Sequence, residues 1–385
     1  FLKVKKLLKK ILIKDKKNCE VLFALANSLV LIGKPDQAIQ YFQEVIKLDQ
    51  KFEKFAGHAY CQLSRLNFNI DTEDLSSLDQ KFTEINDVHN KIALGNALSN
   101  FNFKKKDFLN SSKFLKLSNK LARRFIIKNT NWSIKEEEIL FKNYKNIYKS
   151  IKKNSPKIKI NKSSPIFILG LPRSGTSLVE KILSQSELIE TKGETSFLTK
   201  EIENHFPEIR LKEIERFNSS KLKEIVEQFV SFVSPKNSYF TDKTPHNFLL
   251  LGSLKFLIPN SKIILCSRKM EENLFSMYQI LFNSYSHKFS YDLNDLRAYS
   301  EIYMNLIDFW KKEKINYLNL NYESLVCEPE IIIKKLCNFL GITFNKNMLT
   351  PHLSLTQIHT ASVFQTQRPI NKDSLSKWSK VHSFF

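Results

Sequence analysis

Residues 165–177, PIFILGLPRSGTS, join an apolar run to a short loop of small, hydroxyl-bearing and basic side chains. From Gly170 to Ser177 the spacing is that of a phosphate-binding loop, G-x-x-x-x-G-K-[ST], with Thr176 in the place of the lysine. A strand, a tight turn and a helix N-terminus would direct several backbone N–H groups at one anion. The predicted anion site therefore consists of Leu171, Pro172, Arg173, Ser174, Gly175, Thr176 and Ser177.

The missing lysine narrows the kind of anion that this loop would hold. In an NTPase that ammonium group reaches the β- and γ-phosphates, and a carboxylate after a hydrophobic strand positions magnesium. The best candidate for that strand, KIILCSR, ends with Ser267 and Arg268 and has no aspartate. The residues favour a donor with a single phosphate-linked group and no metal. A nucleotide kinase or NTPase with a degenerate loop remains the alternative.

The segment PIFILGLPRSGTSLVEKIL resembles the 5′-phosphosulfate-binding loop of sulfotransferases that use 3′-phosphoadenosine 5′-phosphosulfate. It is most similar to the protein-tyrosine sulfotransferase branch and to its bacterial relatives fused to tetratricopeptide repeats. Further matching segments follow in order over most of residues 165–380, and the N-terminal region resembles the repeats. The resemblance implies sulfuryl transfer to a hydroxyl acceptor, with adenosine 3′,5′-bisphosphate as the second product.

Individual residues acquire roles through this resemblance. In the family an arginine after a major strand, and a serine eight residues later, hold the 3′-phosphate, and CSRKMEENLFSMY supplies Arg268 and Ser276 at that spacing. Arginine suits this role because it grips phosphate in bidentate fashion. Gly193-Glu194 in TKGETSFL matches the family's catalytic base, which would take the acceptor proton. Lys243 in YFTDKTPHNF matches the catalytic lysine, which with Arg173 would stabilise charge on the moving group.

The C-terminal third contains two further matches to donor-binding segments. LNYESLVCEPE resembles the family's YE-x-LV-x-x-P run, whose tyrosine lies near the nucleotide, here Tyr322. ASVFQTQRPINKDSLSKW resembles the segment that covers the donor, with Ser362 and Lys377 at the family's serine and lysine. The family's arginine-rich acceptor-side features are not found. The acceptor therefore stays open among peptide tyrosine, glycan, lipid and small alcohol, and the positive charge favours an acidic one.

These residues need a parallel sheet to bring them to one edge. Short apolar runs alternate with helical stretches after residue 164, which predicts βαβ units. We expect strands at 165–171, 187–192, 238–241, 261–267 and 315–320. Helices are expected at 175–185, 245–257, 271–284, 292–313 and 329–340, and residues 200–234 are also expected to be helical. The predicted fold class is α/β, a phosphate-loop-like parallel sheet flanked by helices.

An all-helical region is expected before that sheet. Residues 18–50 match one tetratricopeptide unit: Leu25 and Ala26 pack its first helix, Gly33 turns the chain, and Ala38 and Phe42 pack its second helix. Residues 1–14 would be the second helix of a preceding unit, residues 53–66 the first helix of the next, and residues 92–120 a degenerate unit. A generic helical bundle is the alternative.

The basic, polar stretch 142–164 is typical of a connector. We therefore expect a repeat domain with its connector over residues 1–155 and a sulfotransferase domain over residues 156–385. The repeats would bind a protein partner, orient the acceptor or mediate dimerisation. A scaffold with an inactive transferase domain is a third interpretation, against which the joint presence of Glu194, Lys243 and Arg268 speaks.

Composition excludes several classes of protein. The net charge of +21 arises mostly from lysine, since only nine of the 60 basic residues are arginine, and no nucleic-acid-reading motif is present. No apolar run reaches the ~18–20 residues of a membrane span. Five scattered cysteines without C-x-x-C predict reduced thiols in the cytoplasm and no metal site. Because the chain begins inside an expected helix at Phe1, we expect a truncated N-terminus.

Overall fold

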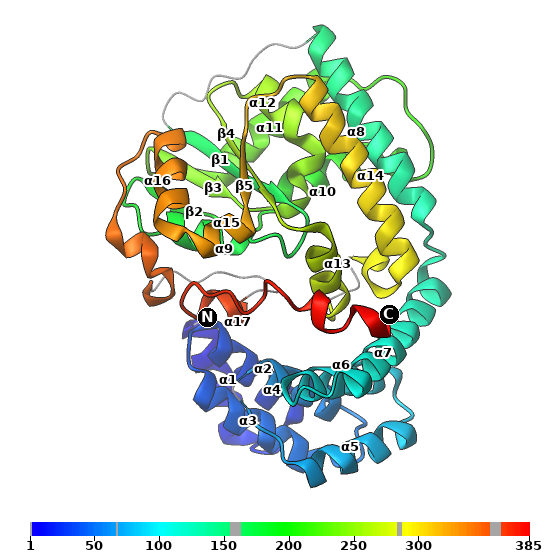
Figure 1. The fold of residues 1–385 in the computed structure, drawn as a ribbon. Coiled ribbons are helices and arrows are strands. Elements are labelled where there is room, and N and C mark those ends of the chain that lie inside the picture. Colours follow the sequence, from blue (N-terminus) through cyan, green and yellow to red (C-terminus); the bar gives the residue numbers. More distant parts are fainter. Residues whose placement is uncertain (1, 67, 155–162, 283–286, 355–362) are drawn as a thin grey trace. The chain divides into compact units, whose positions relative to one another are not determined.

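The computed structural model describes residues 2–66, 68–154, 163–282, 287–354 and 363–385. The chain forms two compact units, whose elements are labelled in Figure 1. The helical unit comprises residues 1–131, 278–293 and 376–385, and the sheet unit comprises residues 132–277 and 294–375. Among the described residues, no helix is both long enough and apolar enough to cross a membrane.

The sheet unit contains a five-stranded parallel sheet of order β2-β3-β1-β4-β5 (Figure 1). Its strands are β1 (Ser164–Gly170), β2 (Ile189–Thr191), β3 (Tyr239–Asp242), β4 (Lys262–Ser267) and β5 (Leu318–Asn321). This sheet confirms the predicted α/β class. Strand β1 lies in the middle, with β2 and β3 on one side and β4 and β5 on the other. The strand order reverses at its carboxyl end, which is where ligands bind in open α/β sheets.

Helices cover both faces of the sheet. On one face Ile166, Ile168 and Ile264 pack in one core with Val179 of α9 and Leu336 of α16. On the other face Phe229 of α11 packs against Phe167 and Phe240, with ring centroids 6.0 and 6.2 Å apart. The apolar run at residues 166–169 is buried on both faces, as expected of a central parallel strand. The helices are α8 (Ile134–Asn154), α9 (Thr176–Leu183), α10 (Phe197–His205), α11 (Ser219–Val233), α12 (Leu251–Leu257), α13 (Met270–Tyr278), α14 (Leu293–Lys312), α15 (Tyr322–Cys327), α16 (Pro329–Leu340) and α17 (Val363–Thr366).

The lysine-rich stretch expected to be a connector is helical up to residue 154. Helix α8 buries Tyr144, Ile147 and Ile151 along one face and leaves lysines on the other, so the basic side chains mask an amphipathic pattern. Asn143 fixes this helix within the sheet unit, since its Nδ2 donates to the Ile209 carbonyl at 2.8 Å and its Oδ1 accepts from the Ile214 N–H at 2.7 Å. The first segment of the helical unit accordingly ends at residue 131, whereas the repeat domain with its connector was expected to extend to residue 155.

The helical unit contains α1 (Leu2–Lys14), α2 (Cys19–Leu31), α3 (Pro35–Leu48), α4 (Ala56–Arg65), α5 (Thr72–Glu84), α6 (Val88–Lys104) and α7 (Phe108–Thr130). Helices α2 and α3 form the expected hairpin. Leu25, Ala26, Ala38 and Phe42 are fully buried in it, and Gly33 turns the chain with φ +74°. The all-helical character of this region is confirmed, and its assignment to tetratricopeptide repeats stays a prediction.

Two asparagines of the helical unit hold a segment that comes from far along the chain. Asn119 Nδ2 donates to the Tyr278 carbonyl at 2.9 Å, and Asn96 Nδ2 donates to the Gln279 carbonyl at 3.0 Å. Both asparagines are buried. The described residues of this segment, 278–282 and 287–293, therefore belong structurally with α6 and α7, although Tyr278 is the last residue of α13.

Candidate active site

The predicted phosphate loop connects the carboxyl end of β1 to the N-terminus of α9. Gly170 and Gly175 have φ +145° and +100°, and a Cβ at these positions would lie 2.4 Å from the Cys266 carbonyl oxygen and 2.7 Å from Tyr322 Cδ2. Only glycine fits such positions without a shift of the neighbours. The loop thus brings the first backbone N–H groups of α9, which lack partners within the helix, to the point where the strand order reverses.

Arg173 lies at the tip of this loop in a left-handed conformation, with φ 71°. Its Nε donates to Ser276 Oγ at 3.2 Å, and its Nη2 donates to Gln365 Oε1 at 2.7 Å. Left-handed backbone costs an arginine on the order of 1–3 kcal/mol and concentrates at functional sites. The structure therefore brings together two predicted residues, Arg173 and Ser276, that lie about 100 positions apart.

Arg268 follows β4 and reaches the same loop. Its guanidinium lies 5.0 Å from the centroid of the Tyr322 ring, and its Nη1 donates to the Arg173 carbonyl at 3.2 Å. Its Nη2 donates to the Ser374 carbonyl, and Tyr322 Oη lies 2.7 Å from Ser374 Oγ. The side chain is only 4% exposed, and its Nε is buried with no partner in the described part of the chain. Burial lowers the pKa of Arg268, against the opposing effects of Tyr322, Glu272 and Glu323.

Glu194 and Lys243 form an ion pair beside the carboxyl ends of β2 and β3. Lys243 follows β3 directly and is fully buried, whereas the Glu194 side chain is 37% exposed. The Lys243 N–H donates to the Gly193 carbonyl at 2.9 Å, which aligns the two segments. One end of the pair is thus held in the protein interior while the carboxylate reaches solvent.

Asp242 is the last residue of β3 and directly precedes Lys243. It accepts hydrogen bonds from Thr244 Oγ1 at 2.6 Å, Thr195 Oγ1 at 3.1 Å and Asn247 Nδ2 at 3.2 Å, and it is fully buried. Burial raises the pKa of Asp242 to about 6, although the Thr244 and Thr195 hydroxyls oppose that shift. These bonds tie the segment after Glu194 to the segment after Lys243.

Two predicted donor residues are not placed with this group. Ser362 lies outside the described residues. Lys377 belongs to the helical unit, where its Nζ lies 5.7 Å from the centroid of the Phe103 ring. Sequence reasoning missed Gln365 and Ser374, whose only signal was their place in the segment expected to cover the donor. Within the described ranges no three His, Cys, Asp or Glu side chains gather as metal ligands.

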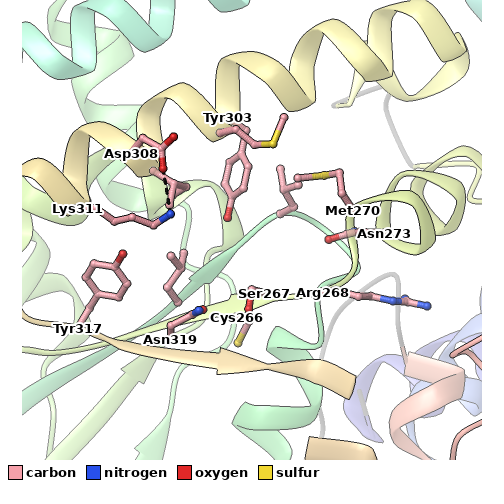
Figure 2. Close-up of a pocket in the computed structure, with 14 residues that line it drawn as sticks. Cys266, Ser267, Arg268, Met270, Asn273, Tyr303, Asp308, Lys311, Tyr317 and Asn319 are labelled. Atoms are coloured by element: carbon pink, nitrogen blue, oxygen red, sulfur yellow. Dashed lines mark hydrogen bonds and ion pairs between the residues drawn. The ribbon is translucent and has the colours of Figure 1, made fainter. Parts of the chain in front are cut away.

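A cavity of about 260 Å³ lies on the α14 side of β4 and β5 (Figure 2). Tyr303, Asp308 and Lys311 of α14 line it, together with Tyr317 and Asn319. Arg268 contributes to its wall, but its guanidinium extends away from the cavity in Figure 2. Arg173, Glu194 and Lys243 do not line this cavity, but Leu171 of the phosphate loop does, so the cavity adjoins the predicted donor residues.

The family model and the similar proteins that carry a functional name are all sulfotransferases. Residues 165–346 match the model described as the sulfotransferase family. An uncharacterized protein of Aquifex aeolicus strain VF5 is 27% identical over 236 residues, 57% of this chain and 31% of that protein. Protein-tyrosine sulfotransferase 1 of Danio rerio is 27% identical over 249 residues, 57% of this chain and 66% of that protein. The chain thus spans less than a third of the first relative and just under two thirds of the second.

Among solved structures, a similar one is the sulfotransferase domain of the Synechococcus PCC 7002 olefin synthase. It has a TM-score of 0.39 and 21% identity, and the match covers 58% of this chain and 91% of that domain.

Proposed function

We propose that the chain transfers a sulfuryl group from 3′-phosphoadenosine 5′-phosphosulfate to a hydroxyl-bearing acceptor, because residues 165–346 match the model of the sulfotransferase family. One observation carries the choice of donor: Arg268, Ser276 and Tyr322 approach the phosphate loop and its Arg173 from three separate elements. Arginine side chains and helix N-termini are the groups that bind phosphate in proteins.

The residues present suit a nucleotide with phosphate groups at two positions. The loop 171–177 would hold the 5′-phosphosulfate, because its glycines leave room for close backbone approach. Arg268 and Ser276 would hold the 3′-phosphate, and the unpartnered Nε of Arg268 supplies a buried donor for it. Tyr322 stacks on Arg268 and would border the nucleotide. Ser362 and Lys377 remain proposed contacts of the covering segment.

In the proposed mechanism, the Glu194 carboxylate takes the proton of the acceptor hydroxyl. Its 37% exposure makes it accessible to an acceptor, and its ion pair with Lys243 fixes its position. The donor supplies an activated sulfuryl group, whose bond to the bridging phosphate oxygen breaks as the acceptor oxygen bonds to sulfur. Lys243 and Arg173 stabilise the negative charge that develops on these oxygens, in a site where burial strengthens each charge.

A nucleotide kinase or NTPase is the alternative for the same loop. Thr176 stands where the lysine of such enzymes would be, and β4 ends at Ser267 without a carboxylate. These positions therefore supply neither the lysine nor the carboxylate with which such enzymes bind a triphosphate and magnesium. These two residues favour the sulfuryl donor.

Ligand-dependent thermal unfolding tests the donor class. Adenosine 3′,5′-bisphosphate at ~100 times its dissociation constant should add about 2.7 kcal/mol to stability without metal, and ATP with magnesium should not. Arg268→Ala should weaken this binding at least tenfold, because it removes a buried phosphate ligand. Arg216→Ala, which removes an exposed arginine from the same unit, should leave it unchanged. Stabilisation by ATP and magnesium alone would reassign the protein to the kinase or NTPase class.

For the helical unit we propose a role in binding a protein partner, orienting the acceptor or mediating dimerisation, supported by the helical hairpin of α2 and α3. Peptide tyrosine, a glycan, a lipid or a small alcohol is the proposed acceptor. A panel of these with radiolabelled donor would identify the class. Sedimentation of the full chain at several concentrations tests dimerisation.

A further inference from the structure

Glu180 is a buried carboxylate that has no part in the mechanism above. It lies on α9, one turn after the phosphate loop, and it is fully buried. Its Oε1 accepts hydrogen bonds from Thr241 Oγ1 at 2.7 Å and from the Gly193 N–H at 3.0 Å. Its Oε2 is buried without a partner in the described part of the chain.

These two bonds reach the segments that carry the proposed catalytic pair. Gly193 immediately precedes Glu194, and Thr241 lies in β3 two positions before Lys243. Thr241 Oγ1 also accepts from the Lys192 N–H at 3.3 Å, so a single hydroxyl links Glu180 to the turn. The Lys243 N–H closes the arrangement by donating to the Gly193 carbonyl at 2.9 Å.

Retaining a carboxyl group here is costly. Burial raises the pKa of Glu180, and the nearby Lys243 ammonium opposes that shift. A buried polar group whose second oxygen lacks a partner forfeits on the order of 1–3 kcal/mol. An apolar side chain would avoid that cost but would leave the Gly193 N–H and the Thr241 hydroxyl without their acceptor, so the use of the carboxylate lies in holding these two donors.

We infer that Glu180 is a positioning residue. By accepting from Gly193 and Thr241, it holds Glu194 and Lys243 in register with the phosphate loop at the start of the same helix. The inference rests on the proposed function, because it assumes that Glu194 and Lys243 act on a donor held by that loop. A shift of about 1 Å between such groups costs on the order of 100-fold in turnover.

Two substitutions separate the hydrogen bonds from the charge. Glu180→Met removes the acceptor oxygen at similar volume, whereas Glu180→Gln keeps a carbonyl oxygen that accepts both bonds. We expect Glu180→Met to lower kcat about 100-fold while the dissociation constant of adenosine 3′,5′-bisphosphate changes less than about threefold, since the loop is intact. Glu180→Gln should retain kcat within about fivefold, because one acceptor oxygen suffices for both donors.

Glu137→Met is the matched control. Glu137 is also a buried carboxylate of the sheet unit, and it accepts from Trp132 Nε1 and Arg210 Nη1, both at 3.3 Å. Its loss should lower the unfolding temperature without changing kcat of the folded protein. If it slows turnover as much as Glu180→Met does, the effect is general destabilisation and the inference is overturned.

The hydroxyl of Thr241 gives a second test should Glu180→Met fail to fold. Thr241→Val removes the donor to Glu180, and Thr241→Ser retains it. Thr241→Val should reproduce the loss of kcat, and Thr241→Ser should keep kcat close to that of the wild-type chain. Unchanged kcat in Thr241→Val, or equal damage from Glu180→Gln and Glu180→Met, would overturn the inference. Failure of the wild-type chain to bind adenosine 3′,5′-bisphosphate would instead reject the proposed function before any variant is compared.

Discussion

Replacing Lys243 with methionine should separate activity from stability. Lys243 is fully buried, and its partner Glu194 is 37% exposed. An ion pair with one partner in solvent is worth only about 0–1 kcal/mol. Burying an ammonium group costs several kcal/mol, and a methionine of similar length recovers much of that cost. We therefore expect Lys243→Met to change the free energy of unfolding by no more than about 1 kcal/mol.

The protonation of Glu180 limits how far Lys243→Met can raise the free energy of unfolding. Lys243 also lowers the pKa of buried Glu180, against the larger effect of burial. Without the ammonium group, Glu180 takes up a proton more readily and its carboxyl remains buried as the neutral form. This uptake keeps the net change small.

The turnover of Lys243→Met should fall strongly although its stability changes little. Loss of one preorganised positive group at the reacting oxygens typically costs 10²–10³ in kcat, about 3–4 kcal/mol of transition-state stabilisation. The assay pairs urea unfolding with transfer of a radiolabelled sulfuryl group to whichever acceptor responds to the wild-type chain.

Lys255→Met is the matched control for this pair of measurements, because Lys255 is a half-buried lysine that donates to the carbonyls of Pro259 and Ser261, both at 2.7 Å. It should lose stability and keep its turnover. A loss of more than about 3 kcal/mol in Lys243→Met would refute the ion-pair reasoning, and unchanged kcat would remove Lys243 from the catalytic group.

Three other perturbations follow from single contacts. Gly175→Ala combines φ +100° with a Cβ 2.7 Å from Tyr322, so it should lose more stability than Gly341→Ala, where φ is +75° and no atom lies within 4 Å; equal losses in thermal unfolding would mean that the Tyr322 contact is irrelevant. Burial raises the pKa of Asp242 from 3.8 to about 6, so the folded state holds a proton that the unfolded chain releases, and stability falls as pH rises through that window. Asp242→Asn should abolish this pH-dependent fall in the free energy of unfolding, which amounts to at most about 3 kcal/mol. If the difference between Asp242→Asn and the wild-type chain in urea unfolding does not change with pH, the assignment of this titration to Asp242 is wrong. Asn119→Ala leaves the buried Tyr278 carbonyl unpaired and should cost about 1–3 kcal/mol, whereas Asn129→Ala on the same helix loses only an exposed bond to Phe125 and should cost less in the same measurement.

Much of the sheet unit could be predicted because its signals are local. Helix α16 begins and ends at the predicted residues, since Pro329 favours the first turn and Gly341 adopts the left-handed cap with φ +75°. The central strand could be placed because its apolar run is continuous. The loop could be placed because glycine is rare in this chain, so the glycines of the loop stand out. Helix α8 was missed for the converse reason, as its buried positions are spaced among lysines that dominate the composition.

The details of the candidate site depend on pairings that no local pattern encodes. Arg268 is separated by 95 positions from the Arg173 carbonyl and by 106 from the Ser374 carbonyl to which it donates. Its spacing to Ser276 could be read from the sequence, but the serine contacts Arg173 instead. Nothing in the run TSLVEKIL distinguishes Glu180 from a surface glutamate, because its two donors lie 13 and 61 positions away.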